Sequence, residues 1–205
     1  SQAYRLCPYA TYLPVRMPLY SQVSGNIMAL LNRHSTECWQ VSIDEAYLVP
    51  AGVDDYGAAL PVAEKIRHEV VVAEGITCSI GVGPSRVVAK IASGYQKPAG
   101  VTIVTPGETA NFLAPLPVGK IPGIGGKTAT ELQKAGIRTI EQLAGCDVQQ
   151  LMEWFGRWGI AMHELALGRD IRPPRQGGQK SLGREVTFAE DLDDREQVCT
   201  AATDL

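Results

Sequence analysis

Two stretches near the start of the chain repeat their apolar residues at helical spacing. In residues 17–34 these positions are Tyr20, Val23, Ile27, Leu30 and Leu31. In residues 57–73 they are Leu60, Ala63, Ile66 and Val70. Apolar residues three or four positions apart lie on one face of an α-helix. We therefore expect two helices, each packed on a core along one face.

Two β-prone runs between these helices predict a hairpin. The runs are CWQVSI (38–43) and AYLV (46–49), and only Asp44 and Glu45 separate them. Strands joined so tightly indicate an antiparallel pair, with the acidic residues at or beside its bend.

Strand and helix patterns then alternate until about residue 105. We expect strands at 76–83 and 100–104 with a helix at 87–95 between them, and a turn at 97–100. Strands that alternate with helices, together with one hairpin, indicate an α+β fold. Its sheet is antiparallel or mixed, with helices on one face.

The pattern changes at residue 106, where the strands stop. Short helical segments broken by glycine and proline follow, and they predict a small all-α domain of roughly 65 residues. The stretch 170–179 is rich in proline, glycine and glutamine, which is typical of an extended linker. Residues 181–188 alternate like a strand.

Charge is unevenly distributed although the net formal charge is only −3. Residues 119–184 hold ten lysines and arginines against six acidic residues, whereas residues 185–205 hold one against seven. The basic segment suits a phosphate backbone, although a solvated basic face explains the same excess.

Composition narrows the cellular setting. The five cysteines are scattered and never in CxxC spacing, so we expect reduced thiols in the cytoplasm rather than disulfides or zinc. No run of eighteen apolar residues appears, so we expect no membrane partner. The first residues show no signal peptide.

Asp44 and Glu45 are the first candidate chemical site. Two adjacent carboxylates repel each other unless a cation compensates them, and Mg²⁺ typically takes one or two protein carboxylates plus substrate phosphates. A solvated acidic turn is the structural alternative. The tight apolar strands on both sides favour the metal site.

The second candidate is the segment PGIGGKTA, which predicts a helix-hairpin-helix motif. Its glycines allow a sharp turn and close approach to another surface, and amides at the start of the next helix can bind phosphate. A purely structural turn between two helices is the alternative. We expect a DNA-backbone contact without base recognition at these residues: Gly123, Ile124, Gly125, Gly126, Lys127 and Thr128.

The third candidate is a set of cations on or after the predicted helix at 87–95. Arg86, Lys90 and Lys97 could stabilise the charge of a leaving pyrophosphate. Lysines on a helix are usually solvated, so Lys97, held between a turn and Pro98, is the strongest of the three.

The three blocks, in this order, resemble the Y-family translesion DNA polymerases, and most closely their DNA polymerase IV (DinB-like) branch. The matching segments are VSIDEAYL (41–48), SIGVGPSRVVAKIASGYQKPAG (79–100), IPGIGGKTATELQKAGI (121–137) and KSLGREVTF (180–188). ATYLPVRMPLYSQVS (10–24) resembles the stretch between the fingers and the palm. The resemblance therefore spans nearly the whole chain.

The resemblance implies an activity and roles for residues. The activity is template-directed DNA synthesis past lesions, in which two Mg²⁺ ions support nucleotidyl transfer from a dNTP to the primer 3′-hydroxyl of primer–template DNA. Asp44 and Glu45 would be metal ligands and catalytic residues, with Ser42 beside them, and Lys97 would face the incoming triphosphate. A sliding clamp is a further partner that the resemblance allows for a full-length protein.

The resemblance also implies a division into domains. Residues 1–16 would end the fingers, 17–107 form the palm, 108–170 the thumb, 171–180 a linker and 181–205 the start of the little finger. The first carboxylate motif of the family would lie N-terminal to this sequence, so we expect residues 1–205 alone to be inactive.

Two other functions compete with this interpretation. A non-catalytic, polymerase-like protein that binds DNA in repair would have no need of Asp44, Glu45 and Lys97. A nucleotidyl cyclase-like palm also uses carboxylates and magnesium, but it does not call for a helix-hairpin-helix motif.

Overall fold

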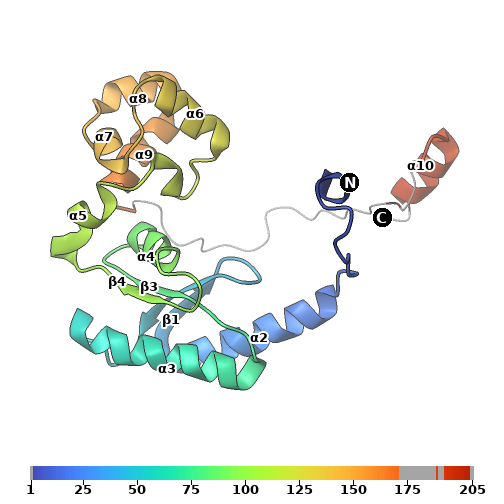
Figure 1. Cartoon of the computed structure of the whole chain (residues 1–205), viewed down its shortest axis with the longest axis horizontal. Helices are drawn as coiled ribbons and strands as arrows, with labels where there is room; N and C mark the ends of the chain where they lie inside the picture. The colour runs from blue at the N-terminus through green and yellow to red at the C-terminus, as the bar shows by residue number, and fades with distance from the viewer. Residues whose placement is uncertain (1, 171–187, 189–191, 204–205) are drawn as a thin grey trace. The chain divides into compact units, whose positions relative to one another are not determined.

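The computed structural model describes residues 2–170, 188 and 192–203. The chain divides into two compact units, residues 1–172 and 173–205. The described part of the second unit contains α10 (Arg195–Thr203). In the first unit the elements (Figure 1) are α1 (Gln2–Leu6), α2 (Met17–Arg33), β1 (Ser35–Gln40), β2 (Ala46–Pro50), α3 (Tyr56–Glu74), β3 (Ile80–Val82), α4 (Arg86–Ser93), β4 (Val101–Ile103), α5 (Thr109–Leu113), α6 (Gly126–Lys134), α7 (Ile140–Ala144), α8 (Val148–Phe155) and α9 (Arg157–Ala166), with short 3₁₀ turns at Pro106–Glu108 and Val118–Lys120.

The predicted hairpin is present, with its bend longer than expected. Strand β1 pairs antiparallel with β2, and Gln40 lies opposite Ala46 as the last pair. The backbone amides of Val41 and Ser42 both donate to the carbonyl oxygen of Glu45, at 2.8 and 3.2 Å. The first strand therefore ends three residues before the predicted limit, because these residues close the turn instead of continuing the ladder.

Strands β3 and β4 form a separate parallel pair, in which Ile80 lies opposite Val101 and Val82 opposite Ile103. Helix α4 connects them, as parallel neighbours require a crossover. The prediction of a strand at 76–83 was too long, since only residues 80–82 pair with a neighbour.

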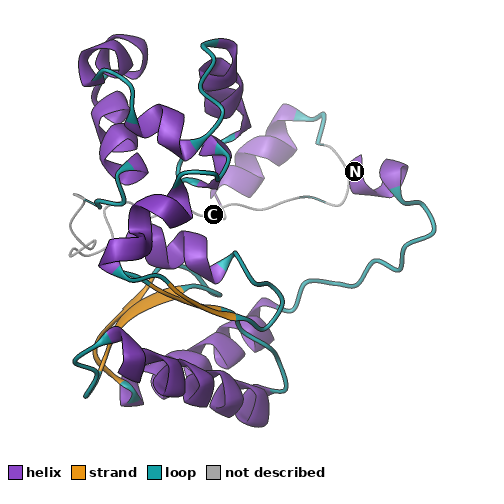
Figure 2. Ribbon diagram, turned by 60° about the vertical axis from the view of Figure 1, so that its left-hand side comes forward, coloured by secondary structure: helices purple, strands orange, loops and turns teal. Residues whose placement is uncertain are grey.

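Helices cover the strands (Figure 2). Helices α2 and α3 pack together along one side, and α4 contacts both β3 and β4. Leu30 of α2 packs with Ile66 and Val70 of α3 in a small core between the two helices. The mixed helix and strand content confirms the predicted α+β class. The expected single sheet with helices on one face was wrong in detail: the described strands form two two-stranded sheets, and helices lie on both sides of them (Figure 2).

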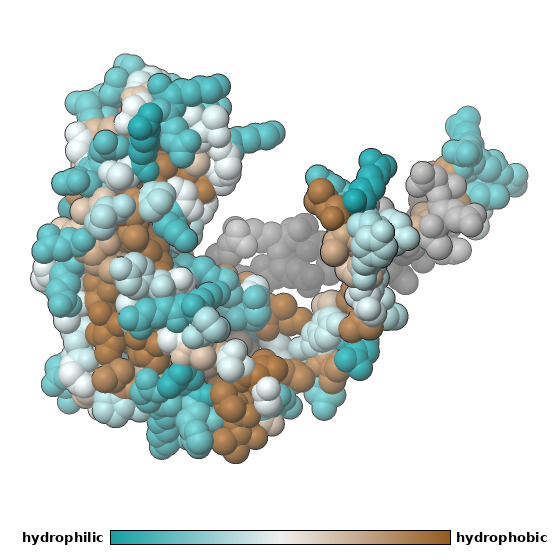
Figure 3. All heavy atoms as spheres, in the orientation of Figure 1, coloured by the Kyte–Doolittle hydropathy of each residue, from teal (hydrophilic) through white to brown (hydrophobic). Residues whose placement is uncertain are grey.

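Two predicted core positions were wrong, one in α2 and one in α3. Tyr20 keeps 42% of its surface exposed, because the buried residues of α2, Ser24 and Leu30, lie further along the helix. Leu60 keeps 46% of its surface exposed, whereas the buried face of the helix runs through Ala59, Ala63, Ile66 and Val70. Leu60 is one residue, about 100° of helix rotation, away from Ala59. Other apolar side chains also reach the surface of the α2 and α3 region (Figure 3).

Helices α5 to α9 form the helical part of the chain, residues 106–167, around a second and larger core. Its fully buried side chains include Leu132, Leu143, Leu151 and Met162. The same core contains Val88 of α4, so α4 packs on the strands and on the helical part at once. The side chains of the N-cap residues Thr139 and Asp147 accept amide hydrogen bonds at the starts of α7 and α8.

Two predictions for the end of the chain fall on residues that the structure leaves out. The linker at 171–180 and all of the strand at 181–188 except its last residue lie outside the described residues. No described helix has both the length and the apolar content needed to cross a membrane.

Candidate active site at the carboxylate hairpin

The bend between β1 and β2 presents Asp44 with an ordered carboxylate. The hydroxyl of Ser42 donates to Asp44 Oδ1 at 2.6 Å, and the backbone amide of Asp44 donates to the same hydroxyl oxygen at 3.4 Å. Asp44 itself is exposed. Its carboxylate is therefore oriented by its own turn while it stays accessible to a ligand.

Gln40 ties this bend to helix α2. Its side-chain amide donates to the Ser24 hydroxyl oxygen at 3.2 Å and to the Ser42 carbonyl at 3.0 Å. Ser24 is the buried polar residue of α2. A buried hydroxyl needs a hydrogen-bond partner, so the pairing satisfies Ser24 and fixes the backbone that carries Asp44.

Glu45 forms an ion pair across the site with Lys90 of α4, between its Oε1 and the lysine Nζ. The position of α4 depends on Gly81 in β3. A Cβ at Gly81 would lie 2.0 Å from the Ala89 carbonyl oxygen and 2.3 Å from the Ser93 nitrogen. The missing side chain lets α4 contact β3 closely, and this contact brings Lys90 to the hairpin.

The electrostatic environment favours the ionised form of Asp44. The Ser42 hydrogen bond is the main cause of a pKa below the ordinary 3.8, and the Asp44 amide, Lys90 and Lys97 lower the pKa further, whereas burial opposes them. The positive charge of Lys97 is the smallest of these causes. The loop that carries Lys97 turns back tightly on itself, since a Cβ at Gly100 would lie 2.0 Å from the Gln96 carbonyl oxygen.

The residues at the bend suit Mg²⁺. Asp44 and Glu45 offer only oxygen ligands, and one or two carboxylates completed by substrate phosphates is a common way to bind this ion. Within the described ranges no cluster of three His, Cys, Asp or Glu side chains forms. The oxygen atoms of Asp44 and Glu45 make the bend the candidate site for a divalent cation.

A second polar junction surrounds the start of α4. The Arg86 guanidinium lies 3.2 Å from the Asp170 carboxylate and 6.0 Å from the centre of the Tyr47 ring. The Ser85 hydroxyl donates to the Gly168 carbonyl oxygen at 2.6 Å. These contacts fasten the end of the helical part to the helix that carries Lys90.

The glycine-rich loop of the helical part has the predicted sharp turn. Gly123 has a φ of +95°, and a Cβ there would lie 2.8 Å from the Trp158 ring. The Ile124 side chain is buried and its amide donates to the Ile121 carbonyl at 3.0 Å. The loop is therefore anchored by an apolar residue and closely covered by an indole.

Helix α6 begins directly after this loop with no side-chain cap. Its N-cap is Gly125. Lys127 is exposed, Thr128 is half-buried and both lie in the first turn. Uncapped amides at a helix N-terminus can donate to phosphate oxygens. The DNA-backbone contact at these residues stays a prediction, and the uncapped first turn of α6 is compatible with it.

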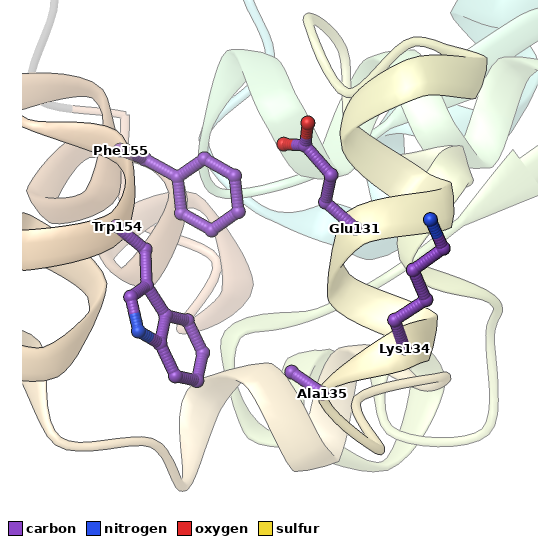
Figure 4. A pocket seen from close by; sticks show the side chains of 5 residues that line it. All are labelled: Glu131, Lys134, Ala135, Trp154 and Phe155. Carbon is purple, nitrogen blue, oxygen red and sulfur yellow. The ribbon is translucent and has the colours of Figure 1, made fainter.

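A shallow cavity of about 490 Å³ lies elsewhere on the helical part (Figure 4). Its lining residues are Glu131, Lys134, Ala135, Trp154 and Phe155. None of the predicted site residues lines it, and Trp154 and Phe155 face the side chains of α6 across it. It contributes nothing to the carboxylate hairpin.

Sequence reasoning did not find two of the contacts at the hairpin. Lys90 was one of three cations expected to meet phosphate, but its pairing with Glu45 depends on a contact between elements 45 residues apart. Gln40 had no distinguishing pattern, because a polar residue at the end of an exposed strand is ordinary.

Comparison with known families agrees with these features. Residues 1–94 match the model of the impB/mucB/samB family, and residues 106–137 match the helix-hairpin-helix motif of the IMS family. The second match covers the loop at Gly123 and all of α6.

Similar proteins extend these matches over most of the chain. "DNA polymerase IV 2" of Methanosarcina mazei is 49% identical over 196 residues, which are 95% of this chain and 53% of the relative. The crystal structure of DinB from Sulfolobus solfataricus has a TM-score of 0.78 at 34% identity, over 84% of this chain and 52% of that one. A Y-family DNA polymerase chimera, Dbh-Dpo4(243-245)-Dbh, has a TM-score of 0.78 at 32% identity, over 87% and 53%.

The chain spans about half the length of the relatives it matches. The matches cover both the carboxylate hairpin and the glycine-rich loop in the order that the sequence predicted. The chain belongs to the DinB-like Y-family of DNA polymerases.

Proposed function

We propose that this chain supplies much of the catalytic palm and the thumb of a DNA polymerase that copies damaged templates. The reaction is template-directed nucleotidyl transfer from a dNTP to a primer 3′-hydroxyl. The observation that carries the proposal is the hairpin bend, where Asp44 and Glu45 are held side by side next to Lys90 and within the electrostatic reach of Lys97.

Each side chain has a role in this proposal. Asp44 and Glu45 bind the divalent cation, and Ser42 keeps the Asp44 carboxylate oriented and ionised. Lys97 binds the triphosphate, whose negative charge grows on the leaving pyrophosphate during transfer. Fixed charges in these positions lower the barrier because they need no reorganisation during the reaction.

The proposed cofactor is Mg²⁺, with two ions in the complete site. When bound, Mg²⁺ supplies positive charge that polarises the phosphate and favours the ionised 3′-hydroxyl. The two carboxylates at the bend are oxygen ligands of the kind that Mg²⁺ prefers, which supports this assignment.

The proposed DNA contact is the loop from Gly123 to Gly126 with Lys127 and Thr128. The uncapped start of α6 and the positive charge of Lys127 support it. Contacts of this type bind the phosphate backbone and leave the base sequence unread.

We also propose the division into domains that the sequence indicated: the end of the fingers (1–16), the palm (17–107), the thumb (108–170), a linker (171–180) and the start of the little finger (181–205). The continuous core between α4 and the helical part supports a palm and thumb that pack as one body. The proposed cellular location is the cytoplasm, and the free thiols of all five cysteines support it.

Primer extension tests the proposed activity. The protein as its gene encodes it, with this chain inside it, should extend a primer on an undamaged and on a lesion-bearing template when Mg²⁺ is present. Asp44→Ala should lower the rate by at least about 10³-fold, since a lost charge contact to the transition state costs several kcal/mol.

Binding of the same DNA separates the alternatives. DNA binding without extension in the wild-type protein would contradict the polymerase proposal and favour a non-catalytic DNA-binding protein. Extension that survives in Asp44→Ala would contradict the role of the hairpin.

A further inference from the structure

Lys90 occupies one oxygen of the carboxylate that is proposed to bind the metal. Its ammonium pairs with Glu45 Oε1, and the two side chains keep 35% and 43% of their surface exposed. The Asp44 carboxylate one residue earlier is engaged by Ser42 instead. The two proposed ligands are therefore held differently: Asp44 by a neutral hydroxyl and Glu45 by a cation.

The ion pair is built into the fold by the packing of α4. One face of this helix is anchored in the larger core. Its buried residues, each with at most 7% of its surface exposed, are Val87, Val88, Ile91 and Ala92. Lys90 is the half-buried charged residue among them. Because α4 contacts β3 at Gly81 and the hairpin bend is held by Gln40, both ends of the pair have fixed backbones.

An ammonium and a divalent cation compete for the same carboxylate oxygen. A metal ion that takes Glu45 Oε1 must first break the pair, and a metal ion on either oxygen of Glu45 lies close to the positive charge of Lys90. We propose that Lys90 is a positioning residue that holds Glu45 until a divalent cation displaces it, and thereby weakens the affinity of the hairpin for the cation alone. This inference rests on the proposed role of Asp44 and Glu45 as metal ligands.

The pair also reduces the repulsion between the two carboxylates at the bend. Two adjacent carboxylates repel each other, and Lys90 compensates the charge of Glu45 while Ser42 orients Asp44. Loss of Lys90 removes this compensation and raises the negative charge at the bend. A divalent cation then binds more tightly, because it meets more negative charge and no competitor.

Manganese binding tests the inference without an activity assay. In the 205-residue chain, Mn²⁺ broadens the backbone amide NMR signals of residues near its site, so the signals of Glu45 and Ala46 report binding at the bend. Lys90→Met has nearly the same length and no charge. Removal of a partly exposed ion pair changes affinity by about 1.5-fold to fivefold. Half of the broadening should therefore occur at a Mn²⁺ concentration lower by that factor.

Two control variants separate competition from net charge. Lys90→Arg keeps a cation beside Glu45 and should broaden as the wild-type chain does. Lys65→Met removes one positive charge from α3, where Lys65 lies 4.0 Å from Glu69, and should also leave the titration unchanged. Tighter binding in Lys65→Met equal to that in Lys90→Met would overturn the inference, since net charge alone would then explain it.

Asp44→Asn distinguishes the inference from the proposal beneath it. Equal broadening at the bend in the wild-type chain and in Asp44→Asn means that the proposed metal site is wrong. If the wild-type signal depends on Asp44 but Lys90→Met binds equally or more weakly, the inference alone is wrong. Lys90→Gln is the second variant: loss of the hairpin signals in both neutral variants would show a purely structural role and overturn the inference.

Discussion

The Ser42 hydroxyl donates a 2.6 Å hydrogen bond to Asp44 Oδ1 at the bend between β1 and β2. The hydroxyl oxygen in turn accepts from the Asp44 amide at 3.4 Å. A short polar side chain two residues before a carboxylate thus closes a local ring that helps to orient an exposed acid. Similar local bonds are common in turns, but here the oriented group is a proposed metal ligand.

Ser42→Ala should raise the pKa of Asp44 toward its ordinary value of 3.8, because the Ser42 hydrogen bond is the largest cause of the lowered pKa. A lowered pKa stabilises the folded chain above pH 3.8, and this contribution is lost as the pH falls through the folded pKa. Carboxyl-carbon NMR titration of Asp44 measures the change. Ser42→Thr keeps the hydroxyl and should retain the low pKa, and an unchanged pKa in Ser42→Ala would contradict the assignment.

The sequence predicted the hairpin because the information for it is local. Apolar runs on both sides of Asp44 and Glu45 leave only these residues for the bend, and the glycine-rich loop at Gly123 follows from the same kind of local signal. Helix boundaries were accurate where a cap marks them, as at Asp55 before α3 and Ser85 before α4.

What the sequence left open depends on packing between distant elements. The pairing of Lys90 with Glu45 requires α4 to lie on β3, and the close contact at Gly81 that permits this has no pattern of its own. The exposure of Leu60 has the same origin, since the choice between two neighbouring helix faces is made by the elements packed against them.

Gly81→Ala should destabilise the chain. The added Cβ would lie 2.0 Å from the Ala89 carbonyl oxygen, which belongs to the backbone of α4 and has little room to move. Overpacking of this kind costs about 1–3 kcal/mol, and it should also weaken the pairing of Lys90 with Glu45. Urea unfolding measures the first effect, and the NMR signals of the hairpin measure the second.

Gly25→Ala is the matched control for this change. Gly25 lies inside α2 with nothing within 4 Å of the added Cβ. Alanine restricts the unfolded chain and favours the helix, so this variant should be about 0.5–1 kcal/mol more stable than the wild-type chain. A loss of stability in both variants would show that contact at Gly81 is not the cause.

Glu69→Gln should flatten the dependence of stability on acid pH. Glu69 accepts a 2.8 Å hydrogen bond from His34, which is the main reason that its pKa lies below the ordinary 4.5. The carboxylate therefore stabilises the fold above pH 4.5, and the contribution disappears as the pH falls through the folded pKa. The free energy of unfolding, measured in urea from about pH 6 to about pH 3, should fall less in Glu69→Gln than in the wild-type chain.

Glu37→Gln is the control, since it removes an exposed carboxylate from β1. It should show the same acid dependence as the wild-type chain. If Glu69→Gln loses stability with acid as steeply as the wild-type chain does, the bond to His34 does not couple folding to protonation.

Lys127→Ala should weaken DNA binding by a similar factor on every sequence. Lys127 is exposed in the first turn of α6, where a positive charge is unfavourable for the helix dipole. Its removal should not unfold the helix, so a weaker complex would report a lost phosphate contact. The slope of log affinity against log salt for duplex DNA should become about 0.9 less negative, as expected for one contact. Fluorescence anisotropy with two unrelated primer–templates measures both quantities.

Lys65→Ala is the control, since it removes an equal charge from α3 and should leave the slope unchanged. Equal changes in the two variants would mean that net charge, and not the loop after Gly123, determines the affinity for DNA.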